Sequence, residues 1–317
     1  MALIEVKNLK KYFPVPSGTL HAVDNVTLSI EKGKTIGIVG ESGCGKSTLG
    51  KTLMRLHDAT SGEVFFNGTE IAGMKMKEFK KTYRAKIQMI FQDPYASLDP
   101  RMSISQLIEE PLKVLGTIRD KQELQKKVDE MMDLVGLAKR LRNTYPHELD
   151  GGRRQRIGIA RALSLNPEFI ICDEPVSALD VSIQAQVLNL LQDLQKEKNL
   201  TYMFITHNMS VVKHISDEIA VMYLGQVIEK CEAKELFKKT LHPYSQALLS
   251  AIPVPNLHTR REKIILKGEL TSPINPKPCC RFAPRCPYAK DECFAKEPKL
   301  RDMGGNHFAA CHFAGKI

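Results

Sequence analysis

Residues 40–47 form the pattern with the clearest chemistry in this chain. They are Gly-Glu-Ser-Gly-Cys-Gly-Lys-Ser and match the P-loop spacing, in which a glycine and four variable residues precede glycine, lysine and serine. Glycines in such a loop let backbone N–H groups turn onto phosphate oxygens, and the helix that follows points its positive end at them. The lysine neutralises phosphate charge, and the serine hydroxyl ligates Mg²⁺. The predicted phosphate-binding residues are Gly40, Ser42, Gly43, Gly45, Lys46, Ser47 and Thr48.

A second pair of chemical groups follows a wholly apolar stretch. Residues 169–172 are Phe-Ile-Ile-Cys, and Asp173 and Glu174 come directly after them. An isolated Asp-Glu pair is usually a solvated surface feature, but ligands of parallel sheets bind where buried strands end. In a chain with a P-loop we therefore expect Asp173 to hold Mg²⁺, directly or through water. We expect Glu174 to be the general base that polarises the attacking water.

The hydrophobic pattern predicts the elements that position these groups. Residues 28–40 alternate and then become apolar, which predicts a strand, a turn and a buried strand before the P-loop. Residues 100–145 are amphipathic and rich in Leu, Lys and Glu, which predicts a helical subdomain broken by Pro146 and by Gly151-Gly152. Strands alternating with helices predict an α/β layered core. The remaining expected elements are a helix from about residue 46, a helix at 156–165, a strand at 169–172, a helix at 182–197 and a strand at 201–206.

Length and composition limit the possible functions. The chain has 317 residues, 43% hydrophobic and 26% charged, which suits a globular protein with one large domain and a small one. The N-terminus lacks the apolar run of a signal peptide, and no stretch approaches the ~18 apolar residues of a membrane span. We therefore expect a cytosolic chain, unless a partner holds it at a membrane. The net charge of +10 fits a solvated basic surface, and also nucleic acid or an anionic membrane as partner.

Taken together, the motifs resemble those of ATP-binding cassette (ABC) proteins, in the expected order and over nearly the whole chain. Gln92 lies in a segment that resembles the Q-loop, residues 149–156 resemble the family signature, and residues 177–180 resemble the D-loop. His207 resembles the switch histidine, and Tyr12 stands where the family places an aromatic ring that stacks on adenine. The resemblance implies a P-loop NTPase (RecA-like) nucleotide-binding domain that binds ATP and Mg²⁺. The implied catalytic residues are Glu174, His207 and Gln92, and the implied Mg²⁺ ligands are Ser47, Gln92 and Asp173.

Two longer segments, residues 92–101 and 241–250, narrow the resemblance to the dipeptide and oligopeptide importer branch. This implies an ATP-hydrolysing subunit that powers peptide uptake and is peripheral on the cytoplasmic face of the inner or cell membrane. The implied partners are a second, non-identical ATPase subunit paired head to tail, two transmembrane permease subunits and, indirectly, an extracytoplasmic peptide-binding protein. Systems that carry nickel or other solutes share this ATPase pattern, so the solute stays open.

The signature departs from the family pattern at Asp150. The family usually has Leu-Ser-Gly-Gly-Gln, whereas residues 149–153 are Leu-Asp-Gly-Gly-Arg. In such pairs the signature of one subunit, here Asp150, Gly151 and Gly152, faces the γ-phosphate held by the other. An ionised Asp150 cannot donate a hydrogen bond, and at roughly 4 Å and an effective dielectric near 20 it repels a phosphate charge by about 4 kcal/mol. That arrangement gives one good and one poor ATP site; alternatively, Asp150 turns away to cap the following helix, and Arg153 compensates its charge.

Five of the eight cysteines lie near the C-terminus: Cys279, Cys280, Cys286, Cys293 and Cys311. In a reducing cytosol such clustering suggests a metal site more than disulfides. Structural zinc prefers close cysteine pairs, and these spacings are wider, whereas an iron–sulfur cluster tolerates varied spacing; a cluster, Zn²⁺ and free thiols therefore all stay open from the residues alone. The importer branch implies a 4Fe–4S cluster on Cys280, Cys286, Cys293 and Cys311. Cys279 is left out because only Cys280 has the branch's Cys-x-Phe context.

These observations predict two domains. Residues 1–235 form the nucleotide-binding domain, with its helical subdomain at about 95–160, and residues 236–317 form a small irregular, cysteine-rich metal module. A proline-rich linker is expected within residues 253–287. The alternative is a soluble ABC ATPase acting on nucleic acid or ribosomes, but the chain has neither a second cassette nor a long coiled-coil insertion, so no nucleic-acid partner is expected. Intact Glu174 and His207 argue against a non-catalytic, regulatory ATP binder.

Overall fold

The structure, a computed structural model, describes residues 2–252, 263–266, 268 and 271–316. The chain divides into two compact units. Unit 1 comprises residues 1–31, 35–72 and 204–317, and unit 2 comprises residues 32–34 and 73–203. The domain boundary at residues 235 and 236 stays a prediction. Part of the predicted proline-rich linker, residues 253–262, 267 and 269–270, lies outside the described residues.

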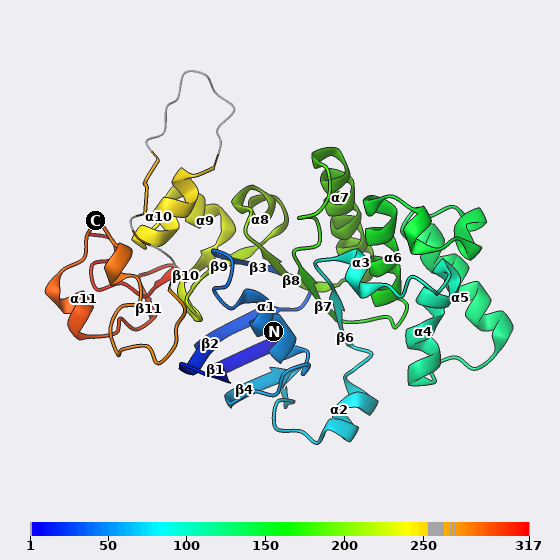
Figure 1. The fold of residues 1–317 in the computed structure, drawn as a ribbon, viewed down its shortest axis with the longest axis horizontal. Coiled ribbons are helices and arrows are strands. Elements are labelled where there is room, and N and C mark those ends of the chain that lie inside the picture. The colour runs from blue at the N-terminus through cyan, green and yellow to red at the C-terminus, as the bar shows by residue number, and fades with distance from the viewer. Residues whose placement is uncertain (1, 253–262, 267, 269–270, 317) are drawn as a thin grey trace. The chain divides into compact units, whose positions relative to one another are not determined.

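Unit 1 is built on two groups of strands (Figure 1). An antiparallel sheet has the order β2-β1-β4-β5, and a second group has the order β11-β12-β10-β9-β3. β3 and β9 are parallel, with Ile36 opposite Glu218, whereas β10 pairs antiparallel with both β9 and β12. The strands are β1 (Ala2–Val15), β2 (Gly18–Glu31), β3 (Thr35–Val39), β4 (Ser61–Phe66), β5 (Thr69–Glu70), β9 (Glu218–Tyr223), β10 (Gln226–Glu232), β11 (Arg301–Asp302) and β12 (Phe308–Ala309). The helices are α1 (Lys46–Leu53), α8 (Met209–Ile215), α9 (Ala233–Lys238), α10 (Pro243–Ser250), the 3-10 turn η3 (Ala283–Arg285) and α11 (Asp291–Ala295).

Unit 2 is mainly helical and contains one parallel strand pair. β6 and β7 pair with Ile87 opposite Phe169, and α4, α5 and α6 pack against one another. β8 (Thr201–Thr206) leaves unit 2 and enters unit 1. The other elements are α2 (Met76–Thr82), β6 (Ile87–Ile90), α3 (Pro94–Ser97), α4 (Ile104–Leu115), α5 (Lys121–Leu134), η1 (Lys139–Asn143), η2 (Pro146–Glu148), α6 (Gly151–Leu163), β7 (Phe169–Asp173) and α7 (Val181–Lys198).

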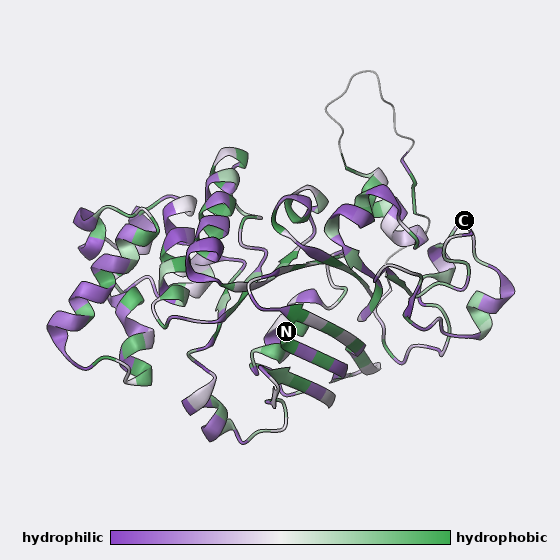
Figure 2. Cartoon of the chain, turned by 180° about the vertical axis from the view of Figure 1, so that it is seen from behind, coloured by the Kyte–Doolittle hydropathy of each residue, from purple (hydrophilic) through white to green (hydrophobic). Residues whose placement is uncertain are grey.

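The strands that lead into the site are buried along their length. All five residues of β3 and all five of β7 are buried, as expected for parallel strands covered on both faces. β2 instead alternates near its end, where Val26, Leu28 and Ile30 are buried and the residues between them are exposed. Figure 2 shows this alternation as green and purple bands along the antiparallel strands. Alternating burial therefore marks the antiparallel strand β2, and continuous burial marks the parallel strands β3 and β7. β3 leads into the P-loop, and β7 leads into the two carboxylates.

Most expected elements are present, with two differences. The glycine pair was expected to separate helices, but this prediction is wrong, because α6 begins at Gly151 and continues to Leu163. Asp150 makes this start possible, since its side chain accepts a hydrogen bond from the backbone N–H of Arg153 at 2.8 Å. The long hairpin of β1 and β2 was not expected either. Within the described part of the chain, no helix has the length and apolar character to cross a membrane.

Candidate active site

The P-loop depends on glycines with positive φ. Gly45 has φ +103°, and a Cβ there would lie 2.0 Å from the carbonyl oxygen of Ala22. A Cβ at Gly40 would lie 2.2 Å from the carbonyl oxygen of Met222. Gly43 has φ +78° and nothing within 4 Å of its ideal Cβ. Two glycines are therefore required by close backbone contacts, while Gly43 is required only by its left-handed conformation.

Lys46 lies folded over the loop that precedes it. Its side chain is 5% exposed, and its Nζ donates to the carbonyl oxygens of Gly40 (2.8 Å) and Glu41 (2.9 Å). Nζ also lies 3.8 Å from the sulfur of Cys44, whose thiol pKa is raised by burial. Lys46, Ser47 and Thr48 form the first turn of α1. The backbone N–H groups at the start of the helix and the lysine charge therefore lie at the same end of the P-loop, where they can both bind phosphate.

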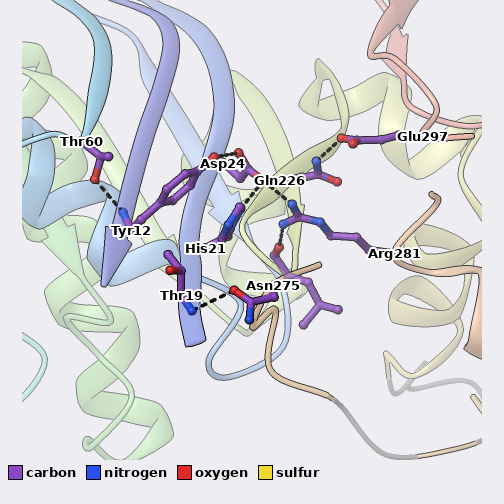
Figure 3. Close-up of polar contacts among 10 residues, drawn as sticks. Tyr12, Thr19, His21, Asp24, Thr60, Gln226, Asn275, Arg281 and Glu297 are labelled. Atoms are coloured by element: carbon purple, nitrogen blue, oxygen red, sulfur yellow. Dashed lines mark hydrogen bonds and ion pairs between the residues drawn. The ribbon is translucent and has the colours of Figure 1, made fainter. Parts of the chain in front are cut away.

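Tyr12 on β1 has its hydroxyl fixed by a polar network (Figure 3). The hydroxyl donates to Oδ1 of Asp24 at 2.5 Å, and the ring is stacked on His21 with 3.8 Å between ring centroids. Burial raises the pKa of the Asp24 carboxyl, but hydrogen bonds from Tyr12 and His21 and the charge of Arg281 outweigh burial, so the pKa is lowered. The aromatic ring therefore has a defined orientation, held by an ionised carboxylate.

Two of the predicted catalytic residues meet in unit 2. The side-chain amide of Gln92 donates to Oε2 of Glu174 at 3.1 Å. Glu174 follows β7 directly and has φ +45°, a conformation that is rare outside glycine. Asp173, the last residue of β7, is 4% exposed. Backbone strain at a residue expected to act as a base is typical of functional sites, where the surrounding structure holds a side chain in one direction.

The signature segment forms the start of helix α6, and Asp150 is its N-cap. Besides its cap bond, Asp150 has Oδ2 3.4 Å from Nε of Arg153. This geometry matches the capping alternative, in which Arg153 offsets the carboxylate charge. Gly152 packs closely against the start of α7, because a Cβ there would lie 2.6 Å from a methyl group of Ile183, and a Cβ at Gly151 would lie 3.1 Å from the side chain of Leu179. Arg154, 6% exposed, donates to the carbonyl oxygens of Pro146 (2.7 Å) and Leu149 and thereby holds the segment before the signature.

His207 lies in unit 1, immediately after β8, and is exposed. The next residue, Asn208, fixes the backbone there: its N–H donates to Oγ1 of Thr206 at 3.0 Å. Its side chain caps α8 by accepting from the N–H of Ser210 at 2.9 Å. His207 therefore stands at the junction between a buried strand and a capped helix.

Four cysteines of the C-terminal segment line one small cavity of about 10 Å³, together with His242, Phe282 and His312. They are Cys280, Cys286, Cys293 and Cys311, whereas Cys279 does not line it. Burial, with a smaller contribution from the charges of Cys293 and Cys311, raises the pKa of Cys280 to about 12. Among the described residues, no three His, Cys, Asp or Glu side chains are arranged so that they could hold a metal ion.

Comparison with known proteins decides the family. The family model described as "ABC transporter" matches residues 23–177. The oligopeptide transport ATP-binding protein AppF of Bacillus subtilis is 51% identical over 321 residues, which cover 98% of this chain and 97% of that protein. The oligopeptide transport ATP-binding protein OppF of Escherichia coli is 53% identical over 309 residues, covering 97% and 92%. The chain belongs to the ABC transporter family.

This ABC chain also has the C-terminal region expected for the oligopeptide importer branch. The family model described as "Oligopeptide/dipeptide transporter, C-terminal region" matches residues 228–293. Among solved structures, the ATP-binding cassette MJ0796 in a post-hydrolysis state bound to ADP and Pi is 30% identical, with a TM-score of 0.67, and the match covers 73% of this chain and 98% of that one. The predicted α/β ABC nucleotide-binding fold and the resemblance to the oligopeptide-transport branch are thereby confirmed.

Several residues that shape the ABC site were not identified from the sequence. They are His21, Asp24, Arg154, Tyr244, Arg281 and Arg285. Asp24, Tyr244, Arg281 and Arg285 act through contacts with residues more than 200 positions away, such as the pair of Arg285 and Glu41, so no local pattern marks them. The side-chain hydrogen-bond partners of His21 and Arg154 lie within eight positions, but no sequence motif marks these contacts. The one signal that could have drawn attention to the two C-terminal arginines is their position directly beside Cys280 and Cys286.

Proposed function

We propose that this chain is the ATP-hydrolysing subunit that powers uptake of dipeptides or oligopeptides through a membrane ABC importer. The observation that carries the proposal is the match over 97–98% of the chain to proteins named for oligopeptide transport, which includes the cassette and the C-terminal region together. The P-loop glycines and the contact between Gln92 and Glu174 support it, because they place phosphate-binding and base chemistry in one chain.

The proposed chemistry is hydrolysis of ATP to ADP and phosphate. Backbone N–H groups of residues 40–47 bind phosphate oxygens, and Lys46 leaves its carbonyl partners to neutralise the β- and γ-phosphates. Ser47, Asp173 and Gln92 are the residues that would hold Mg²⁺, whose charge stabilises the leaving phosphate. Their oxygen donors suit this hard cation.

Glu174 is proposed to be the general base that activates the attacking water. Gln92 donates to Oε2 of this carboxylate, and the carboxylate is proposed to accept the proton of the water. His207 is proposed to contact the γ-phosphate and to sense its loss. Tyr12 is proposed to stack on the adenine, with its ring orientation set by Asp24 and His21. Binding of ATP closes the pair of subunits, and hydrolysis resets it.

The proposed assembly contains a second, non-identical ATPase subunit, two permease subunits and a peptide-binding protein outside the membrane. The chain would then be peripheral, on the cytoplasmic face. Asp150 supports an unlike partner, because this signature has a carboxylate where the family usually has a serine hydroxyl that can donate to a phosphate. Its ion pair with Arg153 reduces, without removing, the negative charge there.

We further propose a 4Fe–4S cluster on Cys280, Cys286, Cys293 and Cys311. The support for this is that four thiols line one cavity and that such clusters are held by four cysteine thiolates. Burial raises the pKa of Cys280, Cys286 and Cys311. Ligation requires that these thiols lose their protons and turn toward a common centre. Zn²⁺ is the alternative occupant. When bound, the group would supply four covalent anchors to a segment with few regular elements.

The direct test is transport in vesicles. The chain, its partner ATPase and the permeases are reconstituted together with the peptide-binding protein, and ATP-dependent uptake of labelled peptides and of nickel is measured. Peptide uptake that stops when Lys46→Ala replaces the wild-type chain is the expected result. ATP-dependent nickel uptake without peptide uptake would show that the importer carries another solute, and the proposed peptide substrate would be wrong. Salt-sensitive binding to nucleic acid, with no assembly with permeases, would replace it by the alternative function.

A further inference from the structure

The cysteine-bearing segment reaches the P-loop through an arginine. Arg285, beside Cys286, makes two contacts with the carboxylate of Glu41: Nη1 to Oε2 at 2.7 Å and Nη2 to Oε1 at 3.1 Å. The side chains of the two residues are 10% and 29% exposed. Two parallel charge-assisted bonds in a partly desolvated place fix direction as well as distance.

Glu41 is held at its backbone too. Its N–H donates to the hydroxyl of Tyr244 at 2.8 Å, and its carbonyl oxygen accepts from Lys46 at 2.9 Å. Tyr244 is fully buried beside Phe282, with 5.5 Å between ring centroids, so it also connects the P-loop to the C-terminal segment. The second residue of the P-loop is thus positioned by groups that lie more than 200 residues later in the chain.

A second arginine of the same segment reaches the tyrosine side of the site (Figure 3). Arg281, beside Cys280, donates to the carboxylate of Asp24 and to the carbonyl oxygen of Leu224. Asp24 in turn accepts from the hydroxyl of Tyr12. Arg281 is 7% exposed, so its charge and the carboxylate it holds are largely removed from water. This chain of contacts runs from the cysteine segment to the ring proposed to carry the adenine.

We propose that Arg285 and Arg281 are positioning residues for two different parts of the nucleotide, Arg285 for the phosphates and Arg281 for the base. The inference deepens the proposed function and rests on it. Arg285 keeps Glu41 in place, so that Lys46 and the loop N–H groups converge on the phosphates. Arg281 keeps Asp24 ionised and directed at Tyr12, so that the ring stays in its stacking orientation.

The support for both arginines comes from the same fold of the segment. The N–H of Cys280 donates to the carbonyl oxygen of Cys293 at 2.9 Å, and the N–H of Arg285 donates to that of Phe282 at 2.9 Å. Phe282 is 2% exposed and packs edge-on against Tyr223. The segment thereby presents its arginines on one side while its cysteines line the cavity, and loosening it would loosen both parts of the nucleotide site.

The test separates the phosphates from the base by using two ligands on the full-length chain. Dissociation constants for ATP and for inorganic tripolyphosphate are measured by calorimetry with the wild type, Arg285→Gln and Arg281→Gln. We expect Arg285→Gln to weaken both ligands about tenfold, the loss expected for a charge-assisted pair. We expect Arg281→Gln to weaken ATP about fivefold and to leave tripolyphosphate within about twofold, since only the base contacts change.

Arg301→Gln is the matched control, because the Arg301 side chain donates to the carbonyl oxygens of Cys311 and His312, away from Glu41 and Asp24, and lies in the same part of the chain. It should change neither constant by more than about twofold. Arg285→Lys, which keeps the charge but not the two-point geometry, should recover part of the affinity for both ligands. Thermal unfolding of each variant shows whether the fold is retained.

Equal weakening of both ligands by both arginine variants would overturn the inference, because a general loosening of the fold makes no distinction between phosphate and base. Unchanged binding in both variants would overturn it as well. In either case a wild-type chain that binds ATP leaves the proposed function standing. A wild-type chain that binds neither ligand would overturn the proposed function, and the inference with it.

Discussion

Backbone conformation shapes the P-loop, whereas side chains shape the cysteine-bearing segment at residues 280–311. In the P-loop, Gly40 and Gly45 allow close contact with carbonyl oxygens of other strands, and a lysine folds over the turn. In the C-terminal segment, Phe282 and four cysteines fill the interior, and arginines extend from it. The P-loop thus specifies its geometry locally, whereas the C-terminal segment obtains its geometry from distant contacts and, as proposed, from a cluster.

The largest expected effect on nucleotide binding comes from Gly45→Ala. The added Cβ would lie 2.0 Å from a backbone carbonyl oxygen, and φ is +103°, so the loop must move. We expect ATP affinity to fall about 100-fold or more, measured by calorimetry. Gly43→Ala is the matched control, because its Cβ meets nothing within 4 Å and only the left-handed conformation, at about 1–2 kcal/mol, opposes it. If ATP affinity falls equally in Gly45→Ala and Gly43→Ala, close contact with the Ala22 carbonyl oxygen is not what requires glycine at position 45.

A smaller effect on binding is expected from the cysteines. Cys280→Ser and Cys311→Ser should abolish bound iron and acid-labile sulfide in anaerobically purified protein, because each removes one of the four proposed thiolates. ATP affinity should then fall about fivefold, because Arg281 and Arg285 lose the fold that supports them.

Cys279→Ser serves as the control, since Cys279 does not line the cavity. It should retain about four iron and four sulfide per chain and wild-type affinity. One zinc per chain and no sulfide in the wild type would replace the proposed cluster by the alternative metal. Equal iron loss in the control would show that the assignment of ligands is wrong.

The smallest effect on the isolated chain is expected from Asp150→Ser. Serine also caps helices, so the free energy of unfolding should change by less than about 1 kcal/mol, as measured by chemical denaturation. In the assembled complex, however, removal of the negative charge from the signature should raise the rate of ATP hydrolysis, by about twofold if Arg153 already offsets part of the charge. A rate that falls would indicate that the carboxylate has a positive role at the shared site.

The same contrast explains what could be predicted from the sequence. The P-loop, the strand before Asp173 and helix α7 follow from local spacing and apolar runs, because neighbouring residues determine them. The start of α6 was misjudged, since two glycines usually end a helix, and the cap at Asp150 outweighed their preference. The contacts of Arg281 and Arg285 could not be predicted, because pairing with residues more than 200 positions away depends on the complete fold.

Glu174 is the residue on which the proposed activity depends most directly. Glu174→Gln keeps the size of the side chain and an oxygen that can accept from Gln92, but it removes the base. Glu168→Gln is the matched control, because the side chain of Glu168 forms partly exposed ion pairs with Lys32 and Lys86.

The decisive measurement is the rate of ATP hydrolysis by the assembled complex with each glutamate variant, alongside ATP binding by the same preparations. The account predicts a loss of about 100-fold or more in Glu174→Gln, with ATP binding retained and with the Glu168→Gln complex close to wild type. Hydrolysis at the wild-type rate by Glu174→Gln would contradict the assignment of the base and, with it, the proposed catalytic role of this chain.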